Sequence, residues 1–239
     1  MFSARTRLPV SFSVSAFLVT ALILGWPMNG PCQGQGGVAV SFALQSPSLT
    51  LHEPVVVSMS IHNGLAKEVG VDLGYDREGA LKFSIVQPDG STYTAPQILR
   101  RQGISRLPQL SLQPGETYSQ QLVVNKWYSF NKPGNYRILI KLATAIRKDS
   151  GVPAKAEFSQ ELSLQVGARD EQRLEKVCEN LAAAAMQTNA ETALDAAHSL
   201  SYVEDIVAVP YLVRLTKQGP HRAVTKDVAL HGLGRIARL

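Results

Sequence analysis

The sequence predicts an α+β protein whose strands and helices are segregated, with a β-sandwich over residues 38–167 and helices over residues 168–239. Three observations support this fold class. In the first part apolar residues recur at every second position, which is the period of a half-buried strand. Turn sequences rich in Gly, Pro and Asn separate these runs, and no helical period interrupts them. At Gly167 the apolar period changes to that of an amphipathic helix.

The first 34 residues are typical of a secretory signal peptide. Arg5 and Arg7 form a short positive region, and an apolar run follows from Val10 to Trp26. Small and glutamine-rich residues come next, so we expect cleavage between positions 30 and 36. The sequence therefore predicts an exported protein of the periplasm or the exterior.

Two alternatives remain for this segment. It would act as an uncleaved membrane anchor if it were kept, although a span needs about 20 apolar residues and this run is shorter. It would carry a lipid if Cys32 were a lipoprotein site, although Pro31 is an unusual residue before such a cysteine. A membrane contact is expected only through this segment, and only if it is uncleaved.

Alternating apolar and polar residues define the strands of the sandwich. Val55, Val57, Met59 and Ile61 share one face of their strand, and serines lie on the other. One buried and one wet face is the antiparallel pattern. The turn Gln87–Ser91 joins two such runs as a hairpin, because its Pro, Asp and Gly each favour a turn conformation. The predicted strands are 38–45, 55–62, 69–73, 81–87, 91–95, 117–125, 135–143 and 157–166.

Four segments resemble immunoglobulin-like modules of exported bacterial proteins: Leu51–Val57, Ile61–Asn63, Leu112–Glu116 and Pro133–Tyr136. The resemblance implies a two-sheet sandwich of about seven or eight strands. The Cys, Trp and Cys of the antibody core are missing, so only the architecture is implied. Modules of this type host adhesion, inhibition, scaffolding and enzyme-accessory roles, so the resemblance selects no single activity.

Four short helices are predicted after Gly167. Thr188–Glu191 has the capping-box pattern and is expected to start the second. Ser201–Glu204 has the same spacing and is placed near the start of the third, which Gly219 and Pro220 end. The fourth is expected over residues 221–237, with Val224, Val228, Leu233 and Ile236 facing inward.

Three segments of the helical part resemble HEAT-type repeats: Ala196–Leu200, Val209–Val213 and Ala229–Ile236. Asp205 stands where that family carries an acidic residue between paired helices. The resemblance implies helical hairpins that bury their faces against neighbours. No polar capping helix follows Ile236, so we expect the sandwich to cover one side of this core or the free end to pack on something else.

Charge is unevenly divided within the helical part. Residues 168–205 carry eight acidic and three basic side chains, whereas residues 206–239 carry six basic and one acidic. The simplest interpretation is a pair of solvated outer faces. The alternative is a basic tip, formed by Arg222, Lys226 and Arg235, that binds an acidic protein partner.

Two further places are candidate partner-binding sites. Trp127 begins an aromatic cluster that ends at Phe130 and either plugs one end of the sandwich or stacks on a sugar or peptide. Arg100 and Arg101 lie in the long irregular segment 96–109. Long loops often carry binding residues, but a plain connection is an equally good interpretation.

The sequence shows no catalytic, cofactor-binding or metal-binding motif. The histidines lack metal-ligand spacing, and the phosphate-loop and nucleophile-elbow patterns are missing. The formal net charge is +5, but Arg5 and Arg7 lie in the signal segment, and the +3 of residues 37–239 (22 basic and 19 acidic side chains) is too small to indicate nucleic-acid binding. Two cysteines cannot form a disulfide framework, and we expect Cys178 to be buried.

These features predict an exported, non-enzymatic module that binds a protein partner or serves as a scaffold. An accessory or inhibitory module acting on an extracellular enzyme is the first alternative, with segment 96–109 as the inserting loop. An enzyme with an unrecognised site is the second. A deep pocket lined by converging acidic, histidine or lysine side chains would favour that second alternative.

Overall fold

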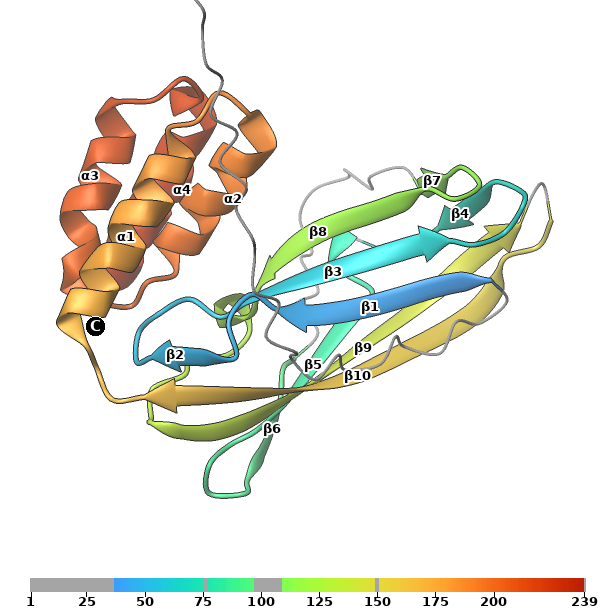
Figure 1. Ribbon diagram of the computed structural model, residues 1–239, viewed down its shortest axis with the longest axis horizontal. Helices are drawn as coiled ribbons and strands as arrows, with labels where there is room; N and C mark the ends of the chain where they lie inside the picture. The colour runs from blue at the N-terminus through green and yellow to red at the C-terminus, as the bar shows by residue number, and fades with distance from the viewer. Residues whose placement is uncertain (1–36, 75–76, 97–108, 149–150, 239) are drawn as a thin grey trace, which may run out of the picture. The chain divides into compact units, whose positions relative to one another are not determined.

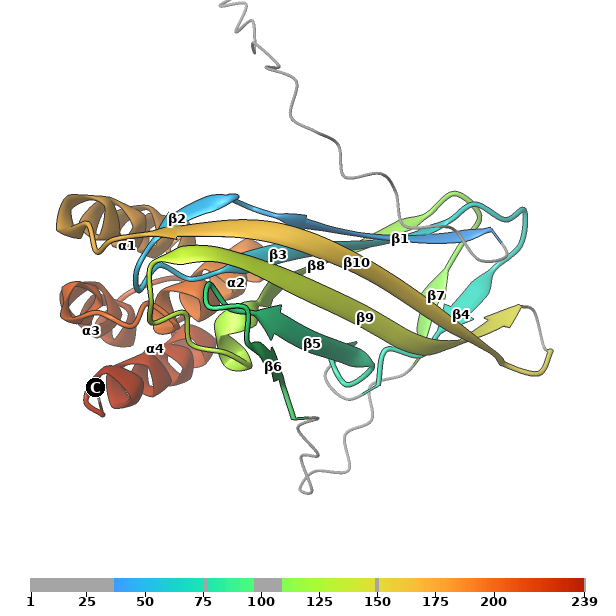
Figure 2. The ribbon, with the colours of Figure 1, turned by 90° about the horizontal axis from the view of Figure 1, so that it is seen from below.

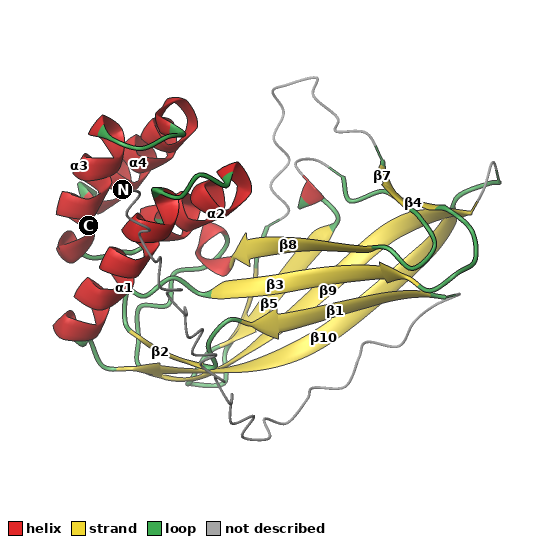
Figure 3. Ribbon diagram, turned by 45° about the horizontal axis from the view of Figure 1, so that its top comes forward, coloured by secondary structure: helices red, strands yellow, loops and turns green. Residues whose placement is uncertain are grey.

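The computed structural model describes residues 37–74, 77–96, 109–148 and 151–238. The predicted signal peptide, Arg100 and Arg101 lie outside the described residues. Within the described part, no helix combines the length and the apolarity needed to cross a membrane. The strands come first and the longer helices follow, which confirms the segregated α+β class (Figure 3).

The strands form two sheets (Figure 1). The smaller sheet is antiparallel, in the order β1 (Val38–Leu44), β3 (Val56–Asn63) and β8 (Thr117–Val123). The larger sheet is built on two long paired strands, β9 (Gly134–Lys148) and β10 (Ala154–Gly167), which run side by side in Figure 2. Its other strands are β2 (Ser48–Thr50), β4 (Val69–Val71), β5 (Leu81–Val86), β6 (Thr92–Thr94) and β7 (Leu110–Leu112).

Alternation along the strands places their apolar side chains in one core. Val57, Met59 and Ile61 of β3 are completely buried, as are Phe83 of β5 and Ile140 of β9. Residues from both sheets belong to the same buried cluster, so the predicted faces meet as a sandwich core. The buried face predicted for residues 55–61 is confirmed.

The structure adds two strands to those that were predicted. β2 and β7 have three residues each, which is too short for alternation to be recognised. β2 pairs in parallel with the end of β10, so the second and the last strand of the sandwich lie side by side. β9 also continues to Lys148, beyond its predicted end at residue 143, because it pairs first with β5 and then with β4.

The Gln160 side chain of β10 joins the two sheets along the edge strand β1. Its carboxamide oxygen accepts a hydrogen bond from the Phe42 N–H (2.9 Å), and its carboxamide nitrogen donates to the Phe42 carbonyl (2.7 Å). Unpaired backbone groups on an edge strand are a template for unwanted pairing. Gln160 therefore forms hydrogen bonds with both the N–H and the carbonyl of Phe42, as a neighbouring strand would.

Four helices follow the sandwich: α1 (Glu171–Ala185), α2 (Ala190–Ser201), α3 (Val209–Lys217) and α4 (Arg222–Ile236). Helix α1 packs on α2, α3 packs on α4, and α2 also packs on α4. Asp170 caps α1 by accepting from the Arg173 N–H, and Pro210 occupies the first turn of α3, where its missing N–H costs nothing. The predicted helix count is confirmed for the described residues.

Two expected helix starts were wrong. Asn189, not Thr188, caps α2 by accepting from the Thr192 N–H, since Asn is as good a capping residue as Thr. Ser201 ends α2 rather than starting α3, because its hydroxyl donates to the His198 carbonyl of the last turn. A short 3-10 turn, η3 (Ile206–Ala208), intervenes before α3.

The inward face predicted for α4 was also partly wrong. Val224 is 54% exposed, whereas Thr225, Ala229 and Gly232 are buried. A β-carbon at Gly232 would lie 2.9 Å from the Ser201 Cα. Helix α4 therefore turns its small residues toward α2, because they allow a closer approach than valine would.

Candidate functional site

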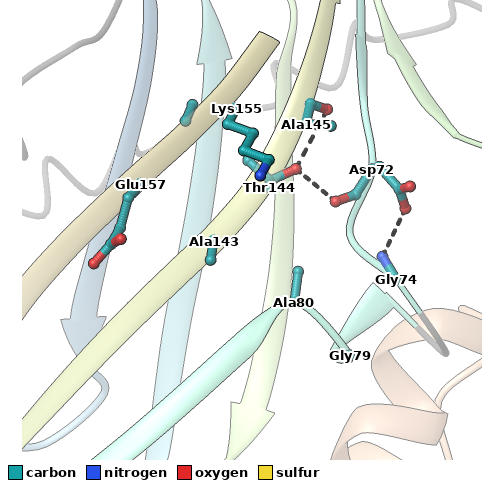
Figure 4. Close-up of a pocket in the computed structure, with 10 residues that line it drawn as sticks. Asp72, Gly74, Gly79, Ala80, Ala143, Thr144, Ala145, Lys155 and Glu157 are labelled. Carbon is teal, nitrogen blue, oxygen red and sulfur yellow. Dashed lines mark hydrogen bonds between the residues drawn. The ribbon is translucent and has the colours of Figure 1, made fainter. Parts of the chain in front are cut away.

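The first hollow lies on the larger sheet, and we call it the alanine pocket. It forms where β9 leaves β5 and meets β4, so that residues 143–145 lie beside the β4–β5 connection. Its volume is about 710 Å³. It is lined by Asp72, Gly74, Gly79, Ala80, Ala143, Thr144, Ala145, Lys155, Ala156 and Glu157 (Figure 4).

The polar groups of the alanine pocket hold the backbone in place. The Thr144 hydroxyl donates to the Asp72 carbonyl (2.5 Å), and the Asp72 carboxylate accepts from the Gly74 N–H (3.0 Å). In Figure 4 the Lys155 side chain extends across β9 toward Thr144, and the Glu157 carboxylate points away. A floor of small apolar residues with charges at the rim can receive an apolar side chain. The partners that the Thr144 hydroxyl has in the described residues are the Asp72 and Ala145 carbonyls.

The second hollow, which we call the seam cleft, lies between β8, α2 and α4 and has a volume of about 620 Å³. It gathers more titratable side chains than the alanine pocket, so it is where the enzyme alternative has to be judged. The lining residues are Glu78, Gln120, Gln121, Val123, Lys126, Leu194, Asp195, His198, Ser201, Tyr202, Val228, His231, Arg235 and Arg238.

The charged groups of the seam cleft include one ion pair and two groups whose pKa is shifted by burial. The Lys126 ammonium is 2.6 Å from the Glu78 carboxylate, so its charge is already compensated. Burial raises the pKa of Asp195 and lowers the pKa of His198, which favours the neutral form of both. Among the hydrogen bonds of the described residues, none joins Asp195 to His198.

Glu53 connects the sandwich to the first helix. Its side chain is 9% exposed and accepts from the Arg173 guanidinium (Nε to Oε2, 2.8 Å) and from the Thr50 N–H (2.9 Å). The Thr50 hydroxyl in turn donates to the Ala168 carbonyl and accepts from the Asp170 N–H. Removing the Arg173 guanidinium would leave the buried Glu53 carboxylate without a compensating charge, which would strongly destabilise the fold.

Asp205 and Glu204 hold the turn between α2 and α3. Asp205 accepts from the Arg169 Nε (2.7 Å) and from the Val207 N–H (3.1 Å), and the Arg169 hydrogen bond lowers the pKa of Asp205. Glu204 accepts from Arg235 (2.7 Å) and from the Ser129 hydroxyl (2.9 Å). The position that the HEAT-type resemblance selected is therefore a structural ion pair.

Trp127 lies against the sandwich core. Its ring stacks on Phe83 at 4.3 Å between ring centroids, and it packs on the core as a partly buried residue. Tyr128, Phe130 and Tyr136 form edge-to-face contacts next to it. This placement agrees with the plug interpretation. The partner-binding role of Trp127 stays a prediction.

The three basic residues predicted to form one tip have different surroundings. Arg222 and Lys226 are exposed on α4. The Arg235 guanidinium instead lies 4.1 Å from the centroid of the Tyr202 ring and pairs with Glu204. Among the described residues, Arg235 thus has an ion pair that Arg222 and Lys226 lack. The Arg222 Nε donates a hydrogen bond to the Thr216 carbonyl (3.2 Å) at the end of α3. Binding at Arg100 and Arg101 stays a prediction, since both lie outside the described residues.

The sequence did not predict the ion pair that joins the sandwich to α1. Glu53 and Arg173 are 120 positions apart, and no periodic pattern links residues at such a distance. Cys178, expected to be buried, is completely so, and burial raises the pKa of its thiol to about 12. Among the described residues, no group of three or more His, Cys, Asp or Glu side chains is placed to hold a metal ion.

The fold defines this protein as a β-sandwich module that carries a four-helix region. Residues 48–167, half of the chain, match the family model of the flagellar collar protein C, N-terminal domain, and the chain belongs to this family. The match begins at the first residue of β2 and ends at the last residue of β10. The HEAT-type resemblance of the helices lies beyond this match and stays a prediction.

Solved structures similar to this chain come from several organisms. The ASH/PapD-like domain 7 of human CEP192 is 12% identical, with 67% of this chain and 100% of that chain covered and a TM-score of 0.33. A CARDB domain from Pyrococcus furiosus is 11% identical over 54% and 86% of the two chains, with a TM-score of 0.30. Spo0M, a sporulation control protein of Bacillus subtilis, is 16% identical over 62% and 56%, also with a TM-score of 0.30. No curated protein matched the chain.

Proposed function

We propose that this chain is an exported, non-enzymatic scaffold subunit of a flagellar collar that acts by binding other proteins. The observation that carries the proposal is the family match over residues 48–167, whose bounds coincide with strands β2 and β10. A flagellar collar is an assembly, so a subunit of it needs surfaces for protein partners. The signal-peptide pattern of residues 1–34 supports the export part of the proposal.

The arrangement of the charged residues supports a scaffold rather than an enzyme. The buried and half-buried carboxylates Glu53, Glu204 and Asp205 each pair with an arginine across segments that are distant in the sequence. Such pairs fix one arrangement of the chain, so these three carboxylates have structural partners. We propose that the helical region is of HEAT type and supplies a second face for partners.

A gene deletion tests this function directly. We expect electron cryotomography of the deletion strain to show flagellar motors with reduced collar density, and the full chain to restore it. A tagged full chain should be enriched in the envelope fraction together with the motors. Unchanged collar density, with the tagged chain absent from purified motors, would contradict the proposal.

A further inference from the structure

The helical region keeps two opposite charge surpluses after its internal ion pairs are counted. Arg169, Arg173 and Arg235 are paired with carboxylates. Among described residues outside such pairs, residues 168–205 keep five acidic side chains and one basic, whereas residues 206–238 keep five basic and one acidic. The surpluses therefore remain available to a partner, and they are complementary.

Some of the unpaired basic residues lie at the start of α4. Positive charge at that end of a helix is unfavourable when no partner is bound. His221 precedes α4 without a side-chain capping hydrogen bond, and the first turn carries Arg222 and no acidic residue. Helix α1 begins instead with the capping Asp170 and with Glu171. A helix N-terminus carries partial positive charge and free N–H groups, so the start of α4 favours an acidic neighbour.

An apolar residue adjoins this basic start. Arg222, Lys226 and Leu230 follow one another at intervals of four residues, so they lie along one side of α4. Leu230 is 48% exposed, which is unusual for a large apolar side chain in the described part of the chain. An apolar residue that becomes covered, with charged residues at its margin, matches the apolar core and polar rim of a protein contact.

Helix α1 carries the matching pattern. Glu175, Glu179 and Ala183 are exposed and also follow one another at intervals of four residues. On α1, two carboxylates precede a small apolar residue. On α4, two cations precede a large apolar residue. When the helices lie alongside each other in parallel, both charge pairs form and Leu230 covers Ala183.

We propose that copies of this chain associate head to tail, with the Glu175, Glu179 and Ala183 side of α1 in one copy on the Arg222, Lys226 and Leu230 side of α4 in the next. The proposal rests on the scaffold function, and it names a second copy as one of the partners. The two patches lie on different helices, so each copy still offers one patch after the other is bound. Contacts of this heterologous kind produce rings when the rotation closes and open chains when it does not.

The contact is weak for a single pair of copies and is strengthened by local concentration. Exposed ion pairs contribute little individually and are screened by salt. Copies held on one flagellar assembly meet at a high effective concentration, so a weak contact is sufficient there. The association in solution should therefore depend on protein concentration and be reduced by salt.

Sedimentation velocity of the full chain tests the proposal with charge reversals. At low salt we expect the wild type to form oligomers as its concentration rises. We expect Glu175→Lys/Glu179→Lys and Arg222→Glu/Lys226→Glu each to weaken association by about tenfold or more, because two attractions become repulsions. An equimolar mixture of the two variants should associate again, since each reversed patch then meets an opposite charge.

A third variant controls for net charge. Arg214→Glu/Lys217→Glu changes the charge by the same amount on exposed residues of α3 and should leave association unchanged. Circular dichroism establishes that all variants are folded. Three results would each overturn the proposal. The wild type could stay monomeric up to about 100 µM, the control variant could lose association to the same extent as the charge reversals, or the mixture of the two reversed variants could fail to associate. If the wild type is monomeric but the deletion strain still loses collar density, the scaffold function stands and only the self-contact is wrong.

Discussion

The sandwich and the helical region bury different kinds of side chain. Among the described residues, the buried cluster of the sandwich consists of large residues and includes no alanine. Alanine supplies half of the buried cluster among the helices, at positions 182, 185, 196, 197, 208 and 229. The sandwich is therefore stabilised mainly by the volume that it buries, and the helices mainly by close approach of their backbones.

This difference reverses the expected effect of changing side-chain size. Removing volume should be most costly in the sandwich, where large side chains fill the space between two sheets. Adding volume should be most costly among the helices, where no space is left for it. Volume changes at Phe83 and Gly232 test this contrast. Charge changes at Asp205 and Arg222, whose expected effects are smaller, test how the helical region is held together.

Phe83→Ala should give the largest loss. Phe83 is completely buried and supports the Trp127 ring, so its removal leaves a cavity and an unsupported stack. We expect the free energy of unfolding to fall by about 3–5 kcal/mol, measured by chemical denaturation. Trp127→Ala, at the partly buried edge of the same contact, should cost less. A loss at Phe83 below about 1 kcal/mol would contradict a volume-filled core.

Gly232→Ala should be the next most costly change. The new methyl group would lie 2.9 Å from the Ser201 Cα and 3.1 Å from the Leu212 side chain, so α4 would have to move away from α2. We expect a loss of about 1–3 kcal/mol in thermal or chemical unfolding.

Gly234→Ala is the matched control on the same helix. A β-carbon there has no neighbour within 4 Å, so only helix propensity changes. It should stabilise the protein by about 0.5–1 kcal/mol. Equal effects at the two glycines would show that close packing does not hold α4.

Asp205→Asn should cost about 1–2 kcal/mol at neutral pH, because the hydrogen bond from the Arg169 guanidinium loses its charge. The folded-state pKa of Asp205 lies below its ordinary value of 3.8, so its contribution is complete above that pH and is lost as the pH falls through the folded-state value. The difference between wild type and variant should therefore shrink in acid. A difference that stays constant down to the lowest accessible pH would exclude the ion pair as its source.

Arg222→Glu should have the smallest effect on stability. The residue is exposed in the first turn of α4, where an acidic side chain suits the helix dipole better than a basic one. We expect a gain of about 0.3–1 kcal/mol in thermal unfolding. A marked loss of stability would show that the hydrogen bond from the Arg222 Nε to the Thr216 carbonyl (3.2 Å) outweighs the effect of the helix dipole. The Glu175→Lys/Glu179→Lys variant would then test association in its place.

The sandwich was more predictable from sequence than the helical packing was. Large alternating residues such as Val57 and Ile140 have one possible inward face, so eight strands could be placed from the pattern alone. Helix α4 has small and apolar residues on several sides, so the pattern placed Val224 inward although Gly232 is the packing residue. The ion pair between the sandwich and α1 could not be predicted, because Glu53 and Arg173 meet only after the whole sandwich has folded between them.

The parallel pairing of β2 with β10 has a consequence for the order of folding. Ser48–Thr50 contacts Gln165–Gly167, so this closure requires nearly the whole sandwich sequence to be present. Contacts between such distant positions form slowly, whereas helices of neighbouring residues form quickly. We therefore expect the α-helices to appear early but to gain their attachment through Glu53 only in the last, rate-limiting step.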